Sequence, residues 1–513
     1  MLSILYPISY IISLSGLIAW FYFQDNRAWS SLVSKIFIGG LLFYLGSLSM
    51  ADGAIEYKLF VLSRDLVIMG VIASVFSYFR NNALLFFGML TLLYGAFSIK
   101  GASVLESTFP EKSDRNINAQ HSYEVAEQGE LLVEIKEDYN IKDIQSILST
   151  YNLKAERAFF PASTNTTTLD DYYLLDVPKQ HTGQLEEIIS ALMETEGVAW
   201  AEENEVVRLS PMESTSQVDA KRKFSVNDPD IQELWGFEAM NVDQLYNGLS
   251  KSKIKPKKKA LIAILDTGVD ATHEDIAANF ISTNKKYDKD NVGHGTHCAG
   301  VAAAVSNNGI GVASFSTSNQ FVQVTSIKVL SRFGGTQEGI IDGMIKAADQ
   351  GAAVISMSLG GMASRDRTRA YDKAVAYCNK KGAIVVTSAG NSNKSAMDNC
   401  PGNSKNVITV SAIDQNLNKA SFSNYVSEVK MGIAAPGVGI YSTIPGNKYT
   451  RYNGTSMSAP YVSGLIGVLK SIQPDLTTKE VYNILHKSGI DTKNTKQTGR
   501  LIQPAKALEY VID

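Results

Sequence analysis

The chain has 513 residues, of which 45% are hydrophobic and 19% charged, and its formal net charge is −3. This length exceeds one ordinary domain, so we expect two or three folded units. The mild charge balance gives no sign of the basic surface that nucleic-acid binding needs, and we expect no nucleic-acid partner. The three cysteines have no zinc-ligand spacing, so the redox state of Cys298, Cys378 and Cys400 stays open.

Four apolar runs fill the first hundred residues. They span 1–23, 31–50, about 58–79 and 83–99, and short polar breaks separate them. Each is close to the ~20 residues that a membrane-spanning helix needs. A buried helical core would not need four such runs in succession, and a signal peptide would have a basic start and a small-residue cleavage site. The sequence therefore predicts an all-α four-helix transmembrane domain over 1–100, with the lipid membrane as a partner.

The orientation of this domain is nearly undecided by charge. Lysine and arginine residues are divided almost evenly between the two sides of the runs, so the positive-inside rule does not choose a side. An even number of spans places residue 1 and everything after residue 100 on the same side. The polar stretch 101–128 follows, and its composition predicts a tether.

A small α+β unit is predicted over 129–210. Its expected strands are 131–135, 172–177 and 198–202, and its expected helices are 141–153 and 185–193. This order is a split β-α-β pattern, typical of a ferredoxin-like module. Taken alone, the pattern indicates a free-standing module of unknown role.

Near the end of the chain, Ser456 has a setting that favours nucleophilic chemistry. It lies in the segment 454–460, Gly-Thr-Ser-Met-Ser-Ala-Pro, and an apolar helical run follows at 461–469. A helix N-terminus favours the negative charge that a reacting serine develops. Serine before a helix is also an ordinary N-cap, so this stretch alone leaves both interpretations open.

Three upstream residues supply the groups that a nucleophilic serine needs. Asp266 follows the apolar strand 261–265, and the carboxyl end of a parallel strand is where α/β sheets build their sites. His294 stands between two glycines that allow backbone and substrate to approach closely. Asn391 ends a further strand and offers an amide donor. A nucleophile, a base, a carboxylate and an oxyanion donor make the full set for acyl transfer.

Together these stretches resemble the subtilisin-like serine proteases, the subtilase family. Asp-Thr-Gly, His-Gly-Thr-His and Gly-Thr-Ser-Met-Ser-Ala-Pro occur in that family's order, and the resemblance covers about 227–505. It implies an α/β fold whose parallel sheet is flanked by helices. It also implies the residue roles: Ser456 is the nucleophile, His294 the general base, Asp266 the carboxylate that orients it, and Asn391 an oxyanion donor.

Other residues near these motifs match no catalytic position of the family. His273 and His297 are expected to have no catalytic role. Cys298 resembles the thiol that one branch of the family places behind the histidine, and a buried thiol is usually inert.

The resemblance also implies a surface that binds an extended protein or peptide substrate. Two glycine-containing stretches follow strands and would pair with the substrate backbone, and a third would line the primary specificity pocket. The residues concerned are Gly334, Gly335, Ser358, Leu359, Gly360, Ala389 and Gly390. Ordinary turns between strands remain the alternative for any one of them.

The loop 306–312 resembles the strong calcium site of the family. Calcium takes six or more oxygen ligands, and a glycine-rich loop can aim backbone carbonyls inward. The ligands that the resemblance implies are Asp228, Asp275, Ser306, Asn308, Ile310 and Val312. We therefore expect a structural Ca²⁺, and a loop closed by hydrogen bonds alone is the alternative.

Its place before this domain makes the unit at 129–210 resemble the inhibitory propeptide of the family. Such a unit would assist the slow folding of a parallel sheet and then occupy the cleft through its own tail. Family alignment puts self-cleavage near Ser210, but Pro211 follows and is a poor leaving-side residue. Cleavage further along 211–226, near 221–223, and no cleavage at all are the open alternatives.

The sequence thus predicts a membrane-anchored subtilisin-like serine endopeptidase that is made as a zymogen. Its catalytic domain, 227–513, is expected outside the cytoplasm, where most members of the family work. The alternative is a membrane receptor or scaffold whose protease domain only processes its own chain. A pseudoprotease is disfavoured, because all the catalytic positions are filled.

Overall fold

The structure is a computed structural model, and its described residues fall into two units that divide at Gln120 and His121. The described residues are 2–50, a few positions between 62 and 86, 124–209, 212–213, 224–251, 254–362 and 368–512. Most of the third and fourth apolar runs lies outside the described residues, as does most of the predicted tether 101–128 and of the linker 211–226. The two units are considered separately.

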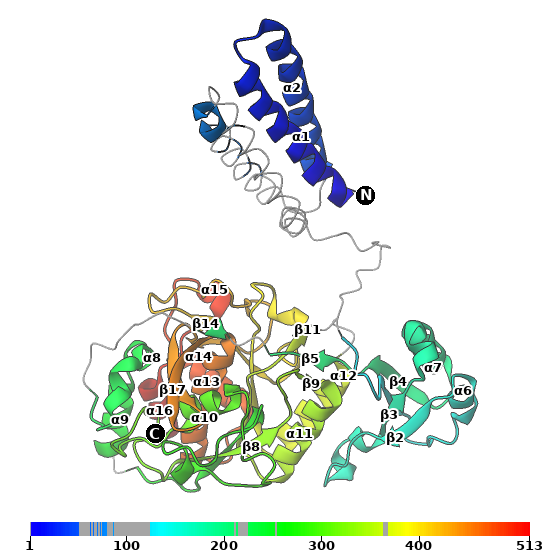
Figure 1. Cartoon of the computed structure of the whole chain (residues 1–513). Coiled ribbons are helices and arrows are strands. Elements are labelled where there is room, and N and C mark those ends of the chain that lie inside the picture. The colour runs from blue at the N-terminus through cyan, green and yellow to red at the C-terminus, as the bar shows by residue number, and fades with distance from the viewer. Residues whose placement is uncertain are drawn as a thin grey trace. The chain divides into compact units, whose positions relative to one another are not determined.

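Two long apolar helices make up most of the described first unit (Figure 1). α1 spans Leu2–Phe23 and α2 spans Arg27–Met50. They approach each other closely at glycine, because a Cβ on Gly16 would lie 2.8 Å from the Cα of Phe37. Small residues of this kind let apolar helices pack without a hydrophobic driving force from water.

One stretch of the described helices, Trp29–Gly46, is long and apolar enough to cross a membrane. A shorter apolar stretch covers Ile12–Phe23. Signal sequences near an N-terminus share this length and composition, so the four-span domain stays a prediction.

The second unit begins with a small α+β fold. Its four-stranded antiparallel sheet has the order β2-β3-β1-β4, and residues of α6 and α7 share a hydrophobic cluster with β1 and β3. The elements are β1 (Leu131–Ile135), α6 (Gln145–Thr150), β2 (Lys154–Arg157), η2 (Thr164–Thr166), η3 (Leu169–Asp171), β3 (Tyr172–Asp176), η4 (Lys179–Gln184), α7 (Leu185–Glu194) and β4 (Val198–Glu203). The β-α-β-β-α-β order is that of a ferredoxin-like module. β2 was not predicted, because its four side chains are all exposed and carry no strand-like alternation.

A six-stranded parallel sheet forms the centre of the larger fold that follows. Its order is β15-β14-β12-β10-β7-β8. The strands are β7 (Ala260–Asp266), β8 (Val322–Lys328), β10 (Val354–Met357), β12 (Ile384–Ser388), β14 (Ile408–Ile413) and β15 (Gly432–Pro436). Along β7, Ile262 and Ile264 pack into one hydrophobic cluster, and Ala263 and Leu265 pack into another. Both faces of the sheet are therefore buried, as is usual for parallel strands.

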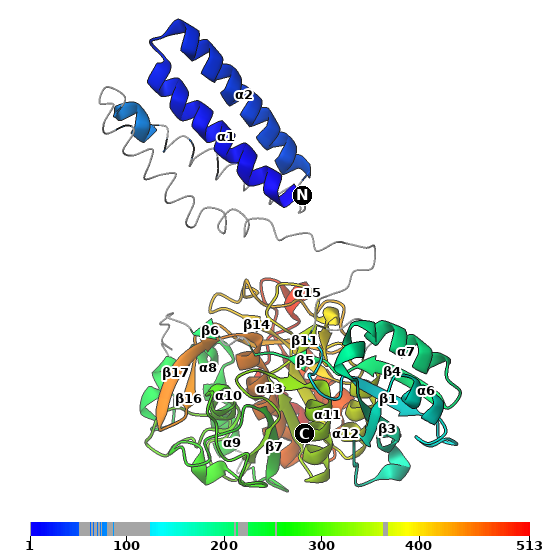
Figure 2. The ribbon, with the colours of Figure 1, turned by 45° about the vertical axis from the view of Figure 1, so that its right-hand side comes forward.

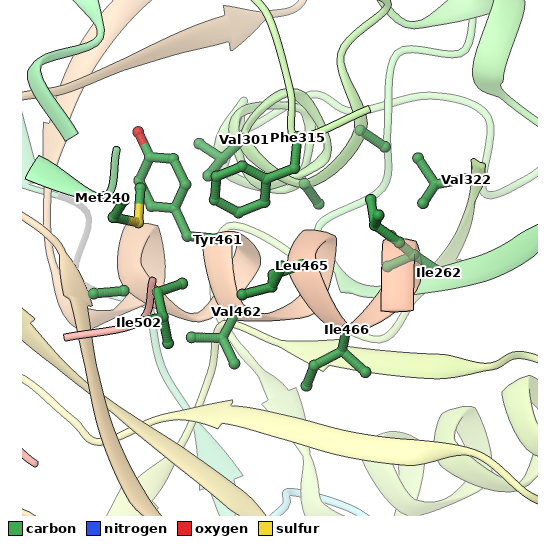
Figure 3. Close-up of a cluster of buried hydrophobic side chains, with 14 of the residues drawn as sticks. Met240, Ile262, Val301, Phe315, Val322, Tyr461, Val462, Leu465, Ile466 and Ile502 are labelled. Carbon is green, nitrogen blue, oxygen red and sulfur yellow. The ribbon is translucent and has the colours of Figure 1, made fainter. Parts of the chain in front are cut away.

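Helices cover both faces of this sheet (Figure 1). The face that includes Ile262 is covered by α8 (Trp235–Ala239), α9 (Val242–Lys251), α10 (His294–Ala303), α13 (Thr455–Ile472), α14 (Thr478–Ser488) and α16 (Pro504–Ile512). The other face is covered by α11 (Gln337–Asp349) and α12 (Arg369–Lys380). All 18 residues of α13 are buried. Figure 3 shows Tyr461 and Leu465 of this helix turned toward Phe315 and Val301.

Short strands extend the fold at its edges (Figure 2). β16 (Ile440–Ile444) and β17 (Lys448–Asn453) form a hairpin, and β6 (Met212–Glu213) pairs with β17. The remaining described elements are β5 (Val206–Val207), β9 (Gly335–Thr336), β11 (Gly361–Met362), β13 (Asn399–Cys400), η5 (Pro229–Glu233), η6 (Ala277–Asn279), η7 (Ala396–Asp398) and α15 (Thr495–Thr498).

Candidate active site

Asp266 and His294 meet at the carboxyl edge of the parallel sheet. Asp266 is the last residue of β7, and His294 is the first residue of α10. The Nδ1 of His294 lies 2.8 Å from Oδ1 and 3.0 Å from Oδ2 of Asp266, and both residues are buried. A Cβ on Gly295 would lie 2.1 Å from the carbonyl oxygen of Gly268. Only glycine therefore lets α10 begin so close to the end of β7.

The charge of Asp266 determines the protonation behaviour of His294. Burial by itself lowers the pKa of the imidazole, but the negative charge of Asp266, the neighbouring Cys298 and the hydrogen bond to Asp266 together raise that pKa by more. The net pKa of His294 lies well above its ordinary value. This carboxylate therefore stabilises the protonated imidazole that a general base becomes.

The two neighbouring histidines have other partners. Burial, and then the charge of His294, lowers the pKa of His297 to about 3, so its ring is neutral. Its Nε2 donates to the carbonyl oxygens of Ile440 at 3.0 Å and Thr450 at 3.2 Å. The Nε2 of His273 lies 3.1 Å from the carbonyl oxygen of Lys448. Both rings thus hold the β16–β17 hairpin in place through hydrogen bonds to its backbone.

Ser456 is the second residue of α13 and lies near the same pair. Its hydroxyl donates to the carbonyl oxygen of Ser358 at 3.1 Å, and no hydrogen bond to His294 is present among the described residues. Cys298 contacts both residues, because its Sγ lies 4.0 Å from Nδ1 of His294 and 3.5 Å from the carbonyl oxygen of Ser456. Without substrate, a hydrogen bond between nucleophile and base is often long and tightens only in the complex.

Burial raises the pKa of the Cys298 thiol, so this side chain is a neutral thiol beside the histidine. The part of the chain that the structure describes has one group of three metal-ligating side chains close together, and it consists of Asp266, His294 and Cys298. These three side chains are fully buried, and two of them already share a hydrogen bond.

The side-chain amide of Asn391 is oriented by Thr455. Its Oδ1 accepts hydrogen bonds from the N–H and the hydroxyl of Thr455, both at 2.9 Å. Among the described residues its Nδ2 has no acceptor, and it would lie 3.5 Å from a Cβ on Gly454. Thr455 was not predicted as a site residue, since the motif itself does not reveal which side chain it holds.

The predicted substrate-binding glycines hold a segment of the chain itself. β5 pairs antiparallel with β9, with Val207 opposite Gly335. A Cβ on Gly334, whose φ is +99°, would lie 2.1 Å from the carbonyl oxygen of Val207. On the opposite side, a Cβ on Gly361 would lie 3.3 Å from Cγ2 of Val207. An extended chain thus lies against the bare backbone at Gly334 and Gly335.

A second segment of the same chain, Met212–Glu213, pairs with the strand that precedes Ser456. Met212 and Glu213 pair antiparallel with Asn453 and Tyr452 of β17. Asn453 directly precedes the turn that leads into α13. Four residues separate the two bound segments, and the last two of them, Ser210 and Pro211, lie outside the described residues.

The side chains of the other predicted substrate-binding residues are buried or absent, so only their backbone groups could contact a substrate. Leu359 and Ala389 are buried. The carbonyl oxygen of Leu359 accepts hydrogen bonds from the hydroxyls of Thr387 at 3.2 Å and Ser388 at 3.3 Å. A Cβ on Gly360 would lie 2.4 Å from Nδ2 of Asn399.

Asn424 organises the loop after Gly390 and was missed by sequence reasoning. Its Nδ2 donates to the carbonyl oxygen of Ala389 at 2.9 Å, and its Oδ1 accepts from the N–H groups of Ser392 and Lys394 at 3.0 Å each. The signal is absent from the sequence, because Asn424 is remote along the chain and belongs to no motif.

The predicted calcium ligands gather around two buried carboxylates. Asp228 accepts hydrogen bonds from the N–H groups of Asn307 at 2.8 Å and Asn308 at 3.1 Å. Asp275 accepts from Nδ2 of Asn308 at 2.9 Å and from the N–H of Val312 at 2.8 Å. The predicted loop therefore wraps around both aspartates. Ser306 lies at its start, and its hydroxyl donates to Ser314.

Burial gives this cluster an unusual charge state. It raises the pKa of Asp275 to about 8, and the nearby charge of Asp228 contributes in the same direction. Burial also raises the pKa of Asp228. Neither carboxylate forms an ion pair with a lysine or arginine in the described segments. A divalent cation would supply the missing positive charge, so the residues present fit calcium.

A parallel sheet that brings an aspartate, a histidine and a serine to one edge defines a subtilisin-type serine protease. The Subtilase family model matches residues 257–501. The chain belongs to the subtilase family, and it is a subtilisin-like serine endopeptidase.

Individual relatives agree with this assignment. Thermitase of Thermoactinomyces vulgaris is 44% identical over 218 residues, which is 41% of this chain and 75% of thermitase. The thermophilic serine proteinase of Bacillus sp. strain AK1 is 34% identical over 366 residues, 70% of this chain and 82% of the relative. A solved structure of proteases from Pseudoalteromonas arctica PAMC 21717 is 27% identical, with a TM-score of 0.50, and covers 56% of this chain and 99% of that one.

The Gly334→Ala variant should weaken substrate binding selectively. The added methyl would stand 2.1 Å from the carbonyl position that Val207 now occupies, so a bound peptide must shift. We expect the KM of an extended peptide to rise by roughly tenfold or more, since each 1.4 kcal/mol is tenfold. Steady-state kinetics with such a peptide measure this.

Gly351→Ala is the matched control for that variant. Gly351 also has a positive φ, +76°, but a Cβ there would meet nothing within 4 Å. It suffers the same left-handed backbone strain without the clash, and its KM should stay unchanged. Equal KM values in both variants would contradict the assignment of Gly334 to the peptide-binding edge.

Proposed function

We propose that the chain is a membrane-anchored serine endopeptidase, made as a zymogen, that hydrolyses peptide bonds through Asp266, His294 and Ser456. The observation that carries this proposal is the pairing of two successive segments of the chain with two strands of the catalytic fold. Val206–Val207 pairs with β9, and Met212–Glu213 pairs with β17, the strand that directly precedes the turn into α13 and Ser456. A protease binds an extended substrate across its nucleophile in the same way.

In the proposed reaction the Ser456 Oγ attacks the scissile carbonyl carbon. The Nε2 of His294 accepts the hydroxyl proton and later donates it to the leaving amine. The carboxylate of Asp266 holds Nδ1–H at 2.8 Å and stabilises the protonated ring. Nδ2 of Asn391 and the N–H of Ser456 donate to the oxyanion, and water then hydrolyses the acyl-enzyme.

The proposed inhibitor is the α+β unit at 129–210, which contacts the catalytic fold through α11. The N–H of Gln337 donates to the carbonyl oxygen of Glu205 at 2.7 Å, and Nε2 of Gln337 donates to Glu202 at 3.0 Å. The N–H of Glu338 donates to Oδ1 of Asn204 at 3.1 Å. The tail thus satisfies donors at the start of α11 that the helix cannot satisfy itself.

A buried charge cluster supports the same docking. Glu134 of β1 is 4% exposed, and its Oε2 lies 3.0 Å from Nε of Arg369. Its Oε1 forms an ion pair with Lys373. The match to the Bacillus relative supports a shared inhibitor unit, because 366 aligned residues must extend well upstream of residue 257 in a chain that ends at 513.

The proposed membrane anchor consists of the apolar segments at the start of the chain. The apolar stretch of α2 and the apolar runs of the first hundred residues support it. We place the catalytic domain on the extracytoplasmic side, where most members of the family work.

The decisive experiment compares the purified full-length chain with Ser456→Ala in detergent. We expect the wild-type chain to cleave an added unfolded protein and Ser456→Ala to lose this activity, because the nucleophile is gone. Mass spectrometry of the mature N-terminus identifies any cut near Ser210 or at 221–223. A wild-type chain that cuts itself but no added substrate would favour the scaffold alternative.

Calcium removal should destabilise the protein. We propose that Asp228, Asp275, Asn308 and the carbonyl groups of Ser306, Ile310 and Val312 hold a structural Ca²⁺. A ligand at 100 times its Kd stabilises the folded state by about 2.7 kcal/mol, so chelation should lower the Tm by several degrees. Differential scanning calorimetry of the Ser456→Ala chain, which cannot digest itself, measures this.

Asp275→Asn should abolish the calcium dependence of the Tm, and Asp398→Asn, an exposed aspartate, should preserve it. Calcium affinity should also strengthen as the pH rises toward 8, because burial raises the pKa of Asp275 to about 8 and the metal requires the carboxylate form. An unchanged Tm in the chelated wild-type chain would contradict the proposed site.

The proposed inhibitor should bind the catalytic fold more weakly at alkaline pH. Burial raises the pKa of Glu202 to about 7 and that of Glu205 to about 8. Both return to ordinary values when the tail leaves, so their contribution to docking is full below pH ~4.5 and is lost as the pH rises through 7 to 8. Arg369 opposes the shift of Glu202, and Tyr371 and Cys400 face Glu205.

Fluorescence anisotropy of a labelled peptide on the Ser456→Ala chain measures this release, because peptide and tail compete for β9. Peptide affinity should rise between pH 6 and 9.5, and Glu205→Gln should flatten that rise. Glu194→Gln, an exposed carboxylate of α7, serves as the control. A pH response that is identical in both variants would exclude Glu205 as its source.

A further inference from the structure

A buried carboxylate, Asp290, lies between the loop after β7 and the start of α10. It is not one of the three proposed catalytic residues. Asp290 is 6% exposed and precedes α10 by a few residues. The sequence motifs did not identify it, and the proposed mechanism does not use it. Burying a carboxylate is costly unless donors surround it, so the groups around Asp290 indicate its purpose.

Five donors surround the side chain of Asp290. Its Oδ1 accepts hydrogen bonds from the hydroxyl of Thr267 and from the N–H groups of Val292 and Gly293, all at 2.9 Å. Its Oδ2 accepts from the N–H of Thr296 at 2.9 Å and from its hydroxyl at 2.8 Å. One carboxylate thus connects the loop after β7 to the first turn of α10.

Thr267 carries this connection to the catalytic carboxylate. Its N–H donates to Oδ1 of Asp266 at 2.7 Å, which is the nearer of the two carboxylate oxygens to Nδ1 of His294. Its hydroxyl accepts the N–H of Gly295 at 3.0 Å while it donates to Asp290. Thr267 is fully buried, so a displacement of Asp290 passes directly to the Asp266 side chain.

We propose that Asp290 is a positioning residue for the Asp266–His294 pair, an inference that rests on the proposed catalytic roles of those two residues. Asp290 fixes the start of α10 against the end of β7, so the imidazole meets its carboxylate before a substrate arrives. The N-terminus of α10 also favours a negative charge. Asp290 itself touches neither substrate nor reacting atoms.

A purely structural role would be the capping of α10, and the two roles differ in what they predict. A cap affects the stability of the fold and leaves the turnover of the folded enzyme unchanged. A positioning residue affects kcat, because small displacements of reacting groups cost rate, up to about a hundredfold per ångström. It leaves KM nearly unchanged, since none of the hydrogen bonds of the Asp290 side chain among the described residues goes to β9 or β17.

The experiment uses the full-length chain in detergent, with Asp290→Asn as the first variant. An amide cannot accept from all five donors, so we expect kcat to fall by roughly tenfold to a hundredfold while KM changes less than about twofold. The downfield proton resonance of the His294 Nδ1–H should shift or broaden in the same variant. Both readouts are taken well below the Tm of each protein.

Asp288→Asn is the matched control. Asp288 lies two residues away and bears the same charge, but it pairs with Ser282 at 2.7 Å and Lys285 at 3.5 Å. It should leave kcat and the resonance unchanged. Thr267→Val is the second variant, for the case in which Asp290→Asn does not fold. It keeps the charge, breaks the link to Asp290, and should lower kcat in the same way.

Two outcomes overturn the proposal. A lower Tm with an unchanged kcat and an unchanged resonance in Asp290→Asn and Thr267→Val would make Asp290 a cap alone. Equal loss of kcat in Asp288→Asn would make the effect one of general charge. Failure of the catalytic roles themselves would be seen separately, as turnover that survives Ser456→Ala.

Discussion

The buried hydrogen bond between Asp266 and His294 requires that the rest of the catalytic fold hold the backbones of both residues in place. Neither group has water to compensate a lost partner, so the bond persists only if both backbones are fixed. The parallel sheet fixes Asp266, because β7 is paired on both sides and covered on both faces. α13, which is buried along its whole length, brings Ser456 to the same edge. The catalytic geometry is therefore a property of the core.

The edge at Gly334 binds the tail of the α+β unit and is also the edge that we propose binds substrate, and both would need the same absent side chain at Gly334. A tail in the same chain has a high effective concentration, so it outcompetes a free peptide of equal affinity. In the proposed zymogen, activation would therefore require either that the chain is cut or that the docking weakens. The proposed competition between inhibitor and substrate would thus take place at a single strand edge.

Motifs with local constraints could be predicted from the sequence. Three motifs could be recognised because each must allow a close backbone approach. They are the turn after Asp266, the glycines around His294 and the small residues around Ser456. Long-range partners could not be predicted. Asn424, Thr455 and Asp290 act through hydrogen bonds to residues that are distant in sequence or belong to no pattern, and β2 is an exposed edge strand without alternation. The rotamer of Ser456, whose hydroxyl donates to the carbonyl oxygen of Ser358, also could not be predicted from the sequence.

Two buried carboxylates, Asp290 and Glu205, differ in the number of hydrogen-bond donors around them, and this difference indicates different roles. Asp290 accepts five hydrogen bonds from a framework that does not need to open. Glu205 has an Oε1 with no partner among the described residues, and burial raises its pKa to about 8. The hydroxyl of Tyr371 nearby is also unpartnered in the described part of the chain. A fully satisfied carboxylate strengthens a permanent contact, whereas an unsatisfied one lowers the cost of separating two surfaces, which suits the contact that the proposed zymogen would eventually lose.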